Sequence, residues 1–446
     1  MRRLPVMDIF NKDMDLRSSH FTGALRKVMC DSDRLLRHSF IVFFFTHAAS
    51  AANMLFQMVM GWNLSKAEFG VLSSMLALMM VIVMPMSAIS NTLVHFTGNL
   101  IKEGKHENIR LLARQWTRRI LFISIPLMIL LVILHHPLAS FFHLTTPWPL
   151  ILAGATLFVS VLSPVFGGVL QGMQKFVLVG LPGLANGLIR LGLGGFLVLV
   201  IAPNAVSGLS AHAFAALCST ALAYLFYLKC LPPSAPDSKP LLESSDKYFW
   251  ASLAALLSFS ILMNMDVVLI KHYFKDQDTV GVYARASMIG KMIIFLVQPI
   301  AGAMFPKVVS RGNMASDHKF TFLKALVLTG LIIFGGALLC TIFPQIPLLI
   351  LYRDHAPTPD MISLVRLVCW AMAPLGLVFL LMNLELAQHR LACVMPLALC
   401  AADFIGGVAL FHASLRQVVF VLMTVNVTSL ALLTILPFTR KECKSR

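Results

Sequence analysis

The sequence predicts an all-α membrane protein with twelve transmembrane helices, arranged as two six-helix bundles around a central cavity. The composition is the first reason. Of the 446 residues, 58% are hydrophobic and 13% are charged, and the mean hydropathy is +0.81. Soluble domains carry about 25% charged residues. The length of the apolar runs and the placement of basic residues are the other two reasons.

The apolar residues gather in runs long enough to cross a bilayer, which takes about 20 residues per helix. We expect twelve such helices, at residues 39–62, 69–95, 119–142, 148–172, 176–201, 206–228, 248–271, 280–306, 320–343, 361–385, 389–411 and 416–437.

The basic residues predict the orientation, because cytoplasmic loops are enriched in Lys and Arg. With the N-terminus in the cytoplasm, the inner segments hold 27 of the 36 Lys and Arg, the outer loops and helix ends hold six, and three lie within spans. We therefore expect both termini in the cytoplasm. The net charge of +16 follows this alternation, which argues against nucleic-acid binding.

The expected domains follow from the loops. Residues 1–38 form a polar cytoplasmic arm, and residues 39–228 the N-terminal six-helix bundle. The proline- and serine-rich residues 229–247 form a cytoplasmic linker. A C-terminal six-helix bundle at 248–437 and a cytoplasmic tail at 438–446 complete the chain.

The two bundles show signs of duplication. A shift of 211 residues places Asn53-Met54 on Asn264-Met265 and Gly70-Val71 on Gly281-Val282. Prolines that can kink helices also recur in corresponding helices, as the pairs Pro85 and Pro299, Pro164 and Pro374, and Pro182 and Pro396. Parallel repeats with a site at their interface are typical of transporters.

Polar residues at membrane depth mark the candidate site, since such residues are costly and usually functional. In the span 176–201, Asn186 and Arg190 are four residues apart and share a helix face. Asp403 occupies a comparable place in the second half. Arg190 and Asp403 could form an ion pair that locks the halves together, or they could line a cavity and exchange partners during transport.

A second group lies in the stretch 253–307. Asp266 and Arg285 are expected at similar depth near the outer surface, where they would pair as a gate. Lys291 lies deeper and shares a face with Gln298, and we expect both to line the cavity. Asp266 or Asp403 could also exchange a coupling cation.

Other functions lack a signature in the sequence. The chain has no GxxxxGK[ST], GxSxG or HExxH motif, and no loop large enough for a catalytic domain, so we expect neither an enzyme nor a bound cofactor. The eight cysteines are scattered without CxxC spacing, so we expect packing residues rather than a metal site or disulfides. His47, Asn53 and Gln57 are interpreted as helix-to-helix hydrogen-bonding groups, with a histidine proton relay as the alternative.

Three segments resemble polysaccharide-type flippases of the multidrug/oligosaccharidyl-lipid/polysaccharide exporter superfamily. They are residues 63–96 with Glu68-Phe69-Gly70, residues 163–176 with Gln-Gly-Met-Gln-Lys-Phe, and residues 253–307 with Asn264, Asp266, Gly281, Tyr283 and Phe305-Pro306-Lys307. The resemblance covers residues 39–437. It implies two bundles in a V, and transfer of a polyprenyl-diphosphate-linked oligosaccharide between leaflets.

The prediction is thus an alternating-access flippase of the bacterial cytoplasmic (inner) membrane that serves cell-surface polysaccharide synthesis. Arg190, Lys291, Gln298 and Asn186 would bind substrate, and Asp266, Arg285 and Asp403 would act in gating or ion coupling. Its partners would be the bilayer, the lipid-linked oligosaccharide, and a polymerase and glycosyltransferases. The alternatives are a multidrug or toxin antiporter of the same superfamily, and a non-transport scaffold for envelope enzymes. A major-facilitator transporter is disfavoured, because residues 97–119 lack that class's GxxxDRxGRR-like turn.

Overall fold

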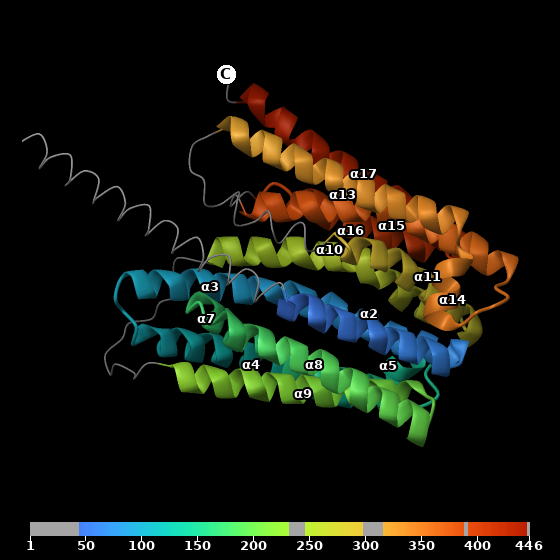
Figure 1. Ribbon diagram of the computed structural model, residues 1–446, viewed down its shortest axis with the longest axis horizontal. Coiled ribbons are helices and arrows are strands. Elements are labelled where there is room, and N and C mark those ends of the chain that lie inside the picture. The colour runs from blue at the N-terminus through green and yellow to red at the C-terminus, as the bar shows by residue number, and fades with distance from the viewer. Residues whose placement is uncertain (1–43, 232–245, 298–314, 388–390, 444–446) are drawn as a thin grey trace, which may run out of the picture.

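The structure, a computed structural model, describes residues 44–231, 246–297, 315–387 and 391–443. All regular secondary structure in these ranges is helical (Figure 1). The first half of the chain contains a helix at 44–63, α2 (Lys66–Val83), η1 (Met84–Met86), α3 (Ser87–Lys102), α4 (Asn108–Ile133), α5 (His135–Phe141), α6 (Trp148–Ser160), α7 (Ser163–Gly172), α8 (Phe176–Phe196), η2 (Leu197–Ile201) and α9 (Ala205–Cys230). The second half contains α10 (Asp246–Tyr273), α11 (Gln277–Phe295), α13 (Ala315–Ile342), α14 (Gln345–Tyr352), α15 (Pro359–Ala387), α16 (Val394–Leu410) and α17 (Leu415–Cys443).

Side-chain caps explain where several helices begin. Ser65 caps α2, Asn204 caps α9 and Asp276 caps α11, and each accepts a hydrogen bond from a free backbone N–H of the first turn. The hydroxyl and amide of Thr279 hold the pKa of the exposed Asp276 below its usual value. These capped helices therefore start at positions that the local sequence specifies.

Each of the twelve predicted spans overlaps a helix, and the chain is a multi-pass membrane protein. Within the described residues, eight helices are long and apolar enough to cross a membrane, or nine if the pair from Leu326–Ile342 to Gln345–Tyr352, bent by 90°, is one span. The count of twelve crossings stays a prediction. α4 begins at Asn108, eleven residues before the predicted span 119–142, and the helix is interrupted at Leu134, shortly before Pro137.

The prolines only partly behave as predicted. Pro85 lies in the 3-10 turn η1, and Pro164 lies at the start of α7, directly after a break from α6. Pro374, its predicted counterpart, lies inside the uninterrupted α15, so these two prolines do not mark matching breaks. Pro299 lies outside the described residues. The proposed duplication therefore stays a prediction.

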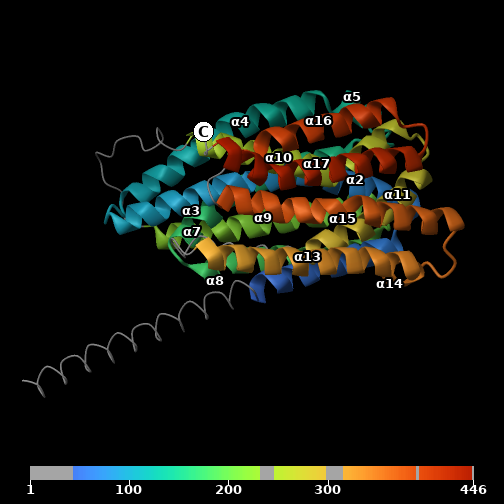
Figure 2. The same cartoon turned by 90° about the horizontal axis from the view of Figure 1, so that it is seen from above.

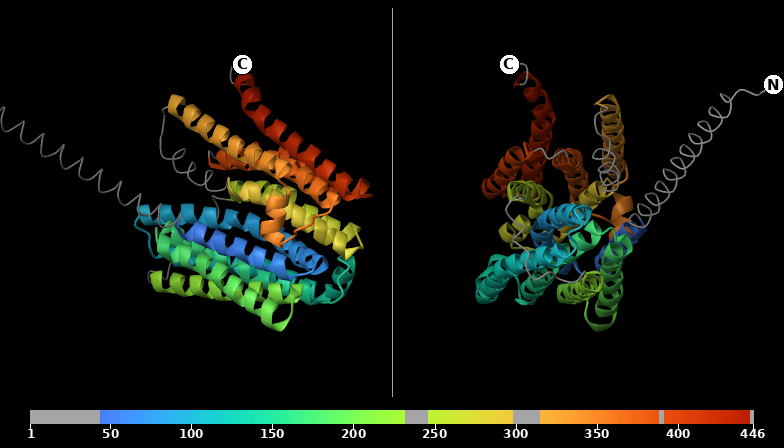
Figure 3. Two further views of the ribbon diagram at one scale, coloured as in Figure 1. Left: turned by 45° about the vertical axis from the view of Figure 1, so that its right-hand side comes forward. Right: turned by 90° about the vertical axis from the view of Figure 1, so that its left-hand side faces the viewer.

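The helices of the two halves lie on opposite sides of the molecule (Figures 1 and 3), and most run along its long axis (Figure 2). α2 of the first half packs against both α10 and α11 of the second. α10 and α15 are the most buried of the membrane-crossing helices, whereas α4 is the most exposed. The contact between the halves is therefore centred on α2, α10 and α11.

Candidate functional site

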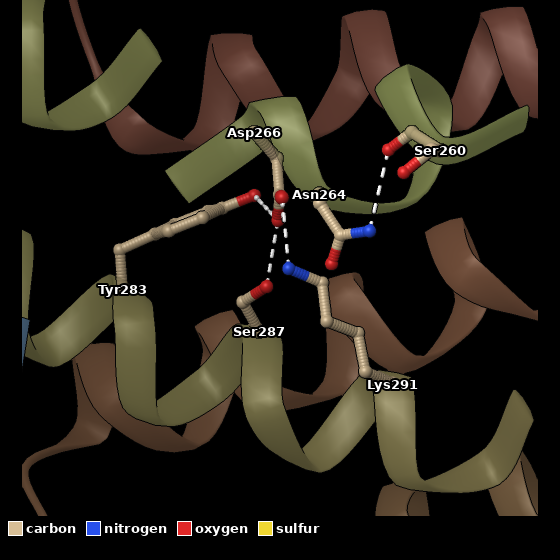
Figure 4. A network of polar contacts seen from close by, with 6 residues as sticks. All are labelled: Ser260, Asn264, Asp266, Tyr283, Ser287 and Lys291. Atoms are coloured by element: carbon tan, nitrogen blue, oxygen red, sulfur yellow. Dashed lines mark hydrogen bonds and ion pairs between the residues drawn. The ribbon is translucent and has the colours of Figure 1, made fainter. Parts of the chain in front are cut away.

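A buried polar network in the second half surrounds Asp266, a residue of α10 with no solvent exposure (Figure 4). Lys291 Nζ lies 2.9 Å from Asp266 Oδ1 and forms a buried ion pair with it. The Tyr283 hydroxyl, at 3.0 Å, and the Ser287 hydroxyl, at 2.6 Å, both donate to Asp266 Oδ2. Three donors thus compensate one buried carboxylate.

Helical spacing builds this network. Tyr283, Ser287 and Lys291 are four residues apart on α11, so one face of that helix presents all three donors to α10. Two residues before Asp266, Asn264 donates to the backbone carbonyl of Ser260, one turn earlier in α10, at 3.3 Å. Tyr283 and Ser287 were not predicted as site residues, although their spacing of eight and four residues from Lys291 indicates that they share its helix face.

The predicted ion pair between Asp266 and Arg285 is not formed. Arg285 Nη2 instead donates to the Leu64 carbonyl at 3.3 Å, and the guanidinium carbon lies 5.0 Å from the ring centre of Tyr352 and 5.8 Å from that of Phe69. Arg285 lies on a different face of α11 from Tyr283, Ser287 and Lys291, which are spaced four residues apart and face Asp266. The prediction used only the depth of each residue in the membrane, and it therefore gave Asp266 the wrong partner.

Arg190 of α8 forms a second buried site, in the first half, where it is 6% exposed. Its Nη2 donates to Asn53 Oδ1 of the first helix, and its Nη1 lies 2.8 Å from His212 Nδ1 of α9. Because a guanidinium only donates, His212 Nδ1 accepts here and carries no proton. The guanidinium carbon also lies 4.7 Å from the ring centre of Phe56.

The charge of Arg190 has no acidic partner in the described part of the chain. Its Nε is buried and donates to no acceptor there. Sequence reasoning did not identify His212 or Phe56, because their distance from Arg190 along the chain gives no spacing pattern.

The remaining predicted site residues are dispersed. Asn186 donates to the Ser219 hydroxyl at 3.1 Å and so joins α8 to α9. Asp403 is exposed on α16, so the alternative of an Arg190–Asp403 lock is wrong in this structure. Gln298 lies outside the described residues. Among the described residues, no group of three or more His, Cys, Asp or Glu could hold a metal ion.

The halves meet most closely at the end that holds residues 61–70, 271–281 and 343–359, called here the predicted outer end. A Cβ added to Gly70 would lie 2.9 Å from the Gly281 nitrogen, and one added to Gly281 would lie 1.9 Å from the Lys66 carbonyl oxygen. Only glycine permits these backbones to approach so closely. We call this contact the glycine seam.

Aromatic side chains extend the glycine seam. Trp62 Nε1 donates to the Ile350 carbonyl at 2.9 Å, and the guanidinium of Arg353 lies 4.3 Å from the Trp62 ring centre. The rings of Phe69 and Tyr352 meet edge to face at 5.3 Å, and Tyr352 donates to the Arg285 carbonyl at 3.2 Å. Arg285 therefore belongs to the closed contact between the halves.

Comparison with known proteins supports the fold. Residues 43–180 match the family model described as MatE. No curated protein has a significant sequence match to the chain. Among solved structures, an inward-facing multidrug resistance MATE family transporter of the MOP superfamily superposes with a TM-score of 0.72 at 13% identity, covering 91% of this chain and 98% of that one.

Two further structures give similar matches. An outward-facing multidrug resistance MATE family transporter has a TM-score of 0.67 at 13% identity, covering 91% of this chain and 96% of that one. The lipid II flippase MurJ in an inward closed conformation has a TM-score of 0.67 at 12% identity, covering 90% of this chain and 87% of that one. The chain has the fold of MATE-type transporters.

Proposed function

We propose that this protein is an alternating-access flippase that moves a polyprenyl-diphosphate-linked oligosaccharide across the cytoplasmic membrane for cell-surface polysaccharide synthesis. The sugar and diphosphate would pass between the two halves while the polyprenyl chain stays in lipid. A polymerase and glycosyltransferases would act before and after this step, and both termini would lie in the cytoplasm.

The buried charge balance is the observation that carries the proposal. Asp266 is compensated by Lys291, whereas Arg190 is bonded only to the neutral groups of Asn53 and His212. Two further buried cations, Lys271 and Arg285, lie at the predicted outer end and also form no ion pair among the described residues. The described interior thus carries surplus positive charge and no surplus acid. Such a site favours an anionic group, and guanidinium binds phosphate oxygens well.

In this proposal the other polar residues keep separate roles. Arg190 and Asn186 would contact the substrate from the first half, and Lys291 and Gln298 from the second. Lys291 could reach the substrate only by exchanging its bond to Asp266, which would make Asp266 the group that changes partners. Arg285 would act in the gate, and Asp403 would exchange a coupling cation.

The glycine seam would be the closed outer gate. The higher TM-score to the inward-facing transporter, 0.72 against 0.67 for the outward-facing one, supports a state closed at the predicted outer end. Release of the substrate outside would require Gly70 and Gly281 to separate.

Arg190 gives the sharper test, because Lys291→Ala would also strip Asp266 of its partner. In proteoliposomes with a fluorescent lipid-linked oligosaccharide, we expect Arg190→Ala to slow flipping at least tenfold at unchanged protein abundance. Arg416→Ala, which removes an exposed cation, is the matched control. Wild-type flipping by Arg190→Ala would refute the assignment.

A multidrug antiporter is the second candidate, favoured by the MatE match and by the buried carboxylate of Asp266. A cationic drug would be repelled by Arg190, so Arg190→Ala should leave drug efflux intact or raise it. Drug efflux by the wild type that Arg190→Ala leaves intact, together with no flipping by the wild type, would decide for this candidate.

A further inference from the structure

The first turns of α4 carry a row of exposed arginines. Arg110, Arg114 and Arg118 are four residues apart, and all three are exposed. None of the three forms an ion pair in the described part of the chain. The nearby acidic Glu103 is already paired with Lys105 at 2.8 Å.

The same face of α4 continues without a break into exposed apolar residues. Phe122 is 81% exposed, and Ile125, Ile129 and Ile133 follow at helical spacing with 45%, 54% and 68%. Large apolar side chains so exposed on a membrane-crossing helix face lipid. The change from arginine to apolar residues therefore places the edge of the hydrocarbon core between Arg118 and Phe122.

The rise of the helix then fixes the depth of each arginine. At 1.5 Å per residue, Arg118 lies about 6 Å, Arg114 about 12 Å and Arg110 about 18 Å from Phe122 along the axis. The headgroup layer is on the order of 5–7 Å thick on each side. Arg118 thus lies within this layer, and the long side chain of Arg114 can reach its outer edge.

The opposite face of α4 fixes the direction of the row. Ile109, Leu112, Ala113 and Trp116 are buried, and the Trp116 ring meets the Phe249 ring of α10 edge to face at 5.0 Å. This packing prevents α4 from turning its arginines inward. The row is therefore held toward the leaflet surface.

We propose that Arg114 and Arg118 form a binding surface for anionic phospholipid headgroups of the leaflet that adjoins the start of α4. The occupant follows from charge complementarity and from the continuity of the row with the lipid-facing surface below it. Each basic side chain near an anionic membrane contributes roughly a fivefold gain in affinity. The inference does not depend on the transported substrate.

The test measures lipid binding directly, by native mass spectrometry of the full-length protein titrated with phosphatidylglycerol or phosphatidylcholine. We expect R114Q/R118Q to lose phosphatidylglycerol affinity on the order of 25-fold, with phosphatidylcholine binding unchanged. R114K/R118K keeps the charges and should stay within about threefold of wild type.

The matched control is K66Q/K275Q/R416Q, which removes three exposed cations at the predicted outer end. It should leave phosphatidylglycerol affinity near wild type. Wild-type affinity in R114Q/R118Q, an equal loss in the control, or an equal loss in the lysine variant would each overturn the proposal. A melting temperature within a few degrees of wild type checks that each variant is folded.

Discussion

At the scale of single residues, two buried cations in the same fold have opposite surroundings. Lys291 forms a tight pair with a carboxylate and has its charge cancelled. Arg190 is equally buried but contacts an amide, an imidazole and an aromatic ring. Burial of an uncompensated charge is unfavourable for stability, so the presence of Arg190 calls for a function.

Asp266→Asn should destabilise the protein strongly, because it leaves the Lys291 ammonium buried without its counter-charge. Breaking a buried pair in this way costs about 3–5 kcal/mol, which thermal unfolding of the detergent-solubilised protein can measure. Asp360→Asn breaks the exposed pair with Arg416 and should cost about 1 kcal/mol or less.

The double variant Asp266→Asn/Lys291→Met completes this comparison. Removing both charges should recover most of the lost stability, since paired charges can be replaced by uncharged groups at little cost. A double variant as unstable as Asp266→Asn alone would show that the network is not organised by this ion pair.

Arg190→Lys should reduce flipping, although the substitution keeps the positive charge. A lysine has a single ammonium group, which cannot bridge Asn53 and His212 with fixed geometry while it covers the Phe56 ring. We expect flipping at least several-fold below wild type in the same proteoliposome assay. Full activity of Arg190→Lys would mean that charge alone is sufficient.

At the scale of elements, the contact between α2 and α11 depends on the absence of side chains at two glycines. Gly281→Ala should lower the melting temperature, because the new Cβ would lie 1.9 Å from a backbone oxygen that cannot move independently of α2. Gly183→Ala in α8 is the control, since its Cβ would meet nothing within 4 Å. That substitution should be neutral or slightly stabilising. Equal melting temperatures for the two variants would contradict the close packing of the glycine seam.

At the scale of the whole molecule, the arginine face of α4 and the glycine seam should lie on opposite sides of the membrane. In a cysteine-free background, a cysteine at exposed position 114 should react with a membrane-impermeant maleimide only after cells are opened. A cysteine at exposed position 416 should react in intact cells. The reverse pattern would overturn the predicted topology while leaving the fold unchanged.

Much of the fold could be predicted from the sequence, because helix length and hydropathy are local properties. The helix boundaries near residues 66, 148, 176 and 205 agree closely with prediction. α4 extends eleven residues before the predicted span that starts at residue 119, because its first turns are amphipathic and polar while still helical. The hydrogen-bond and ion-pair partners of buried side chains were harder to predict, since depth along a helix does not specify which face a residue occupies.

For the candidate site, too, the residues could be selected from the sequence but their contacts could not. Lys291 and Asp266 were both selected from sequence, but their pairing depends on the rotation of α11, and the prediction assigned Asp266 to Arg285. Arg190 was selected correctly as a buried polar residue. Its contact with His212 depends on the packing of α8 against α9, which no local pattern in the sequence encodes.

The glycine seam also bears on how tightly the protein can insulate the membrane. At Gly281 the facing surface is the backbone of Lys66, so there is no side chain that could swing aside and leave a partial opening. Packed surfaces of this kind switch between discrete arrangements and do not deform gradually. Under the proposed function, a cell that stores energy as an ion gradient would thereby be protected from slow leakage through the resting protein, with permeation confined to complete turnovers.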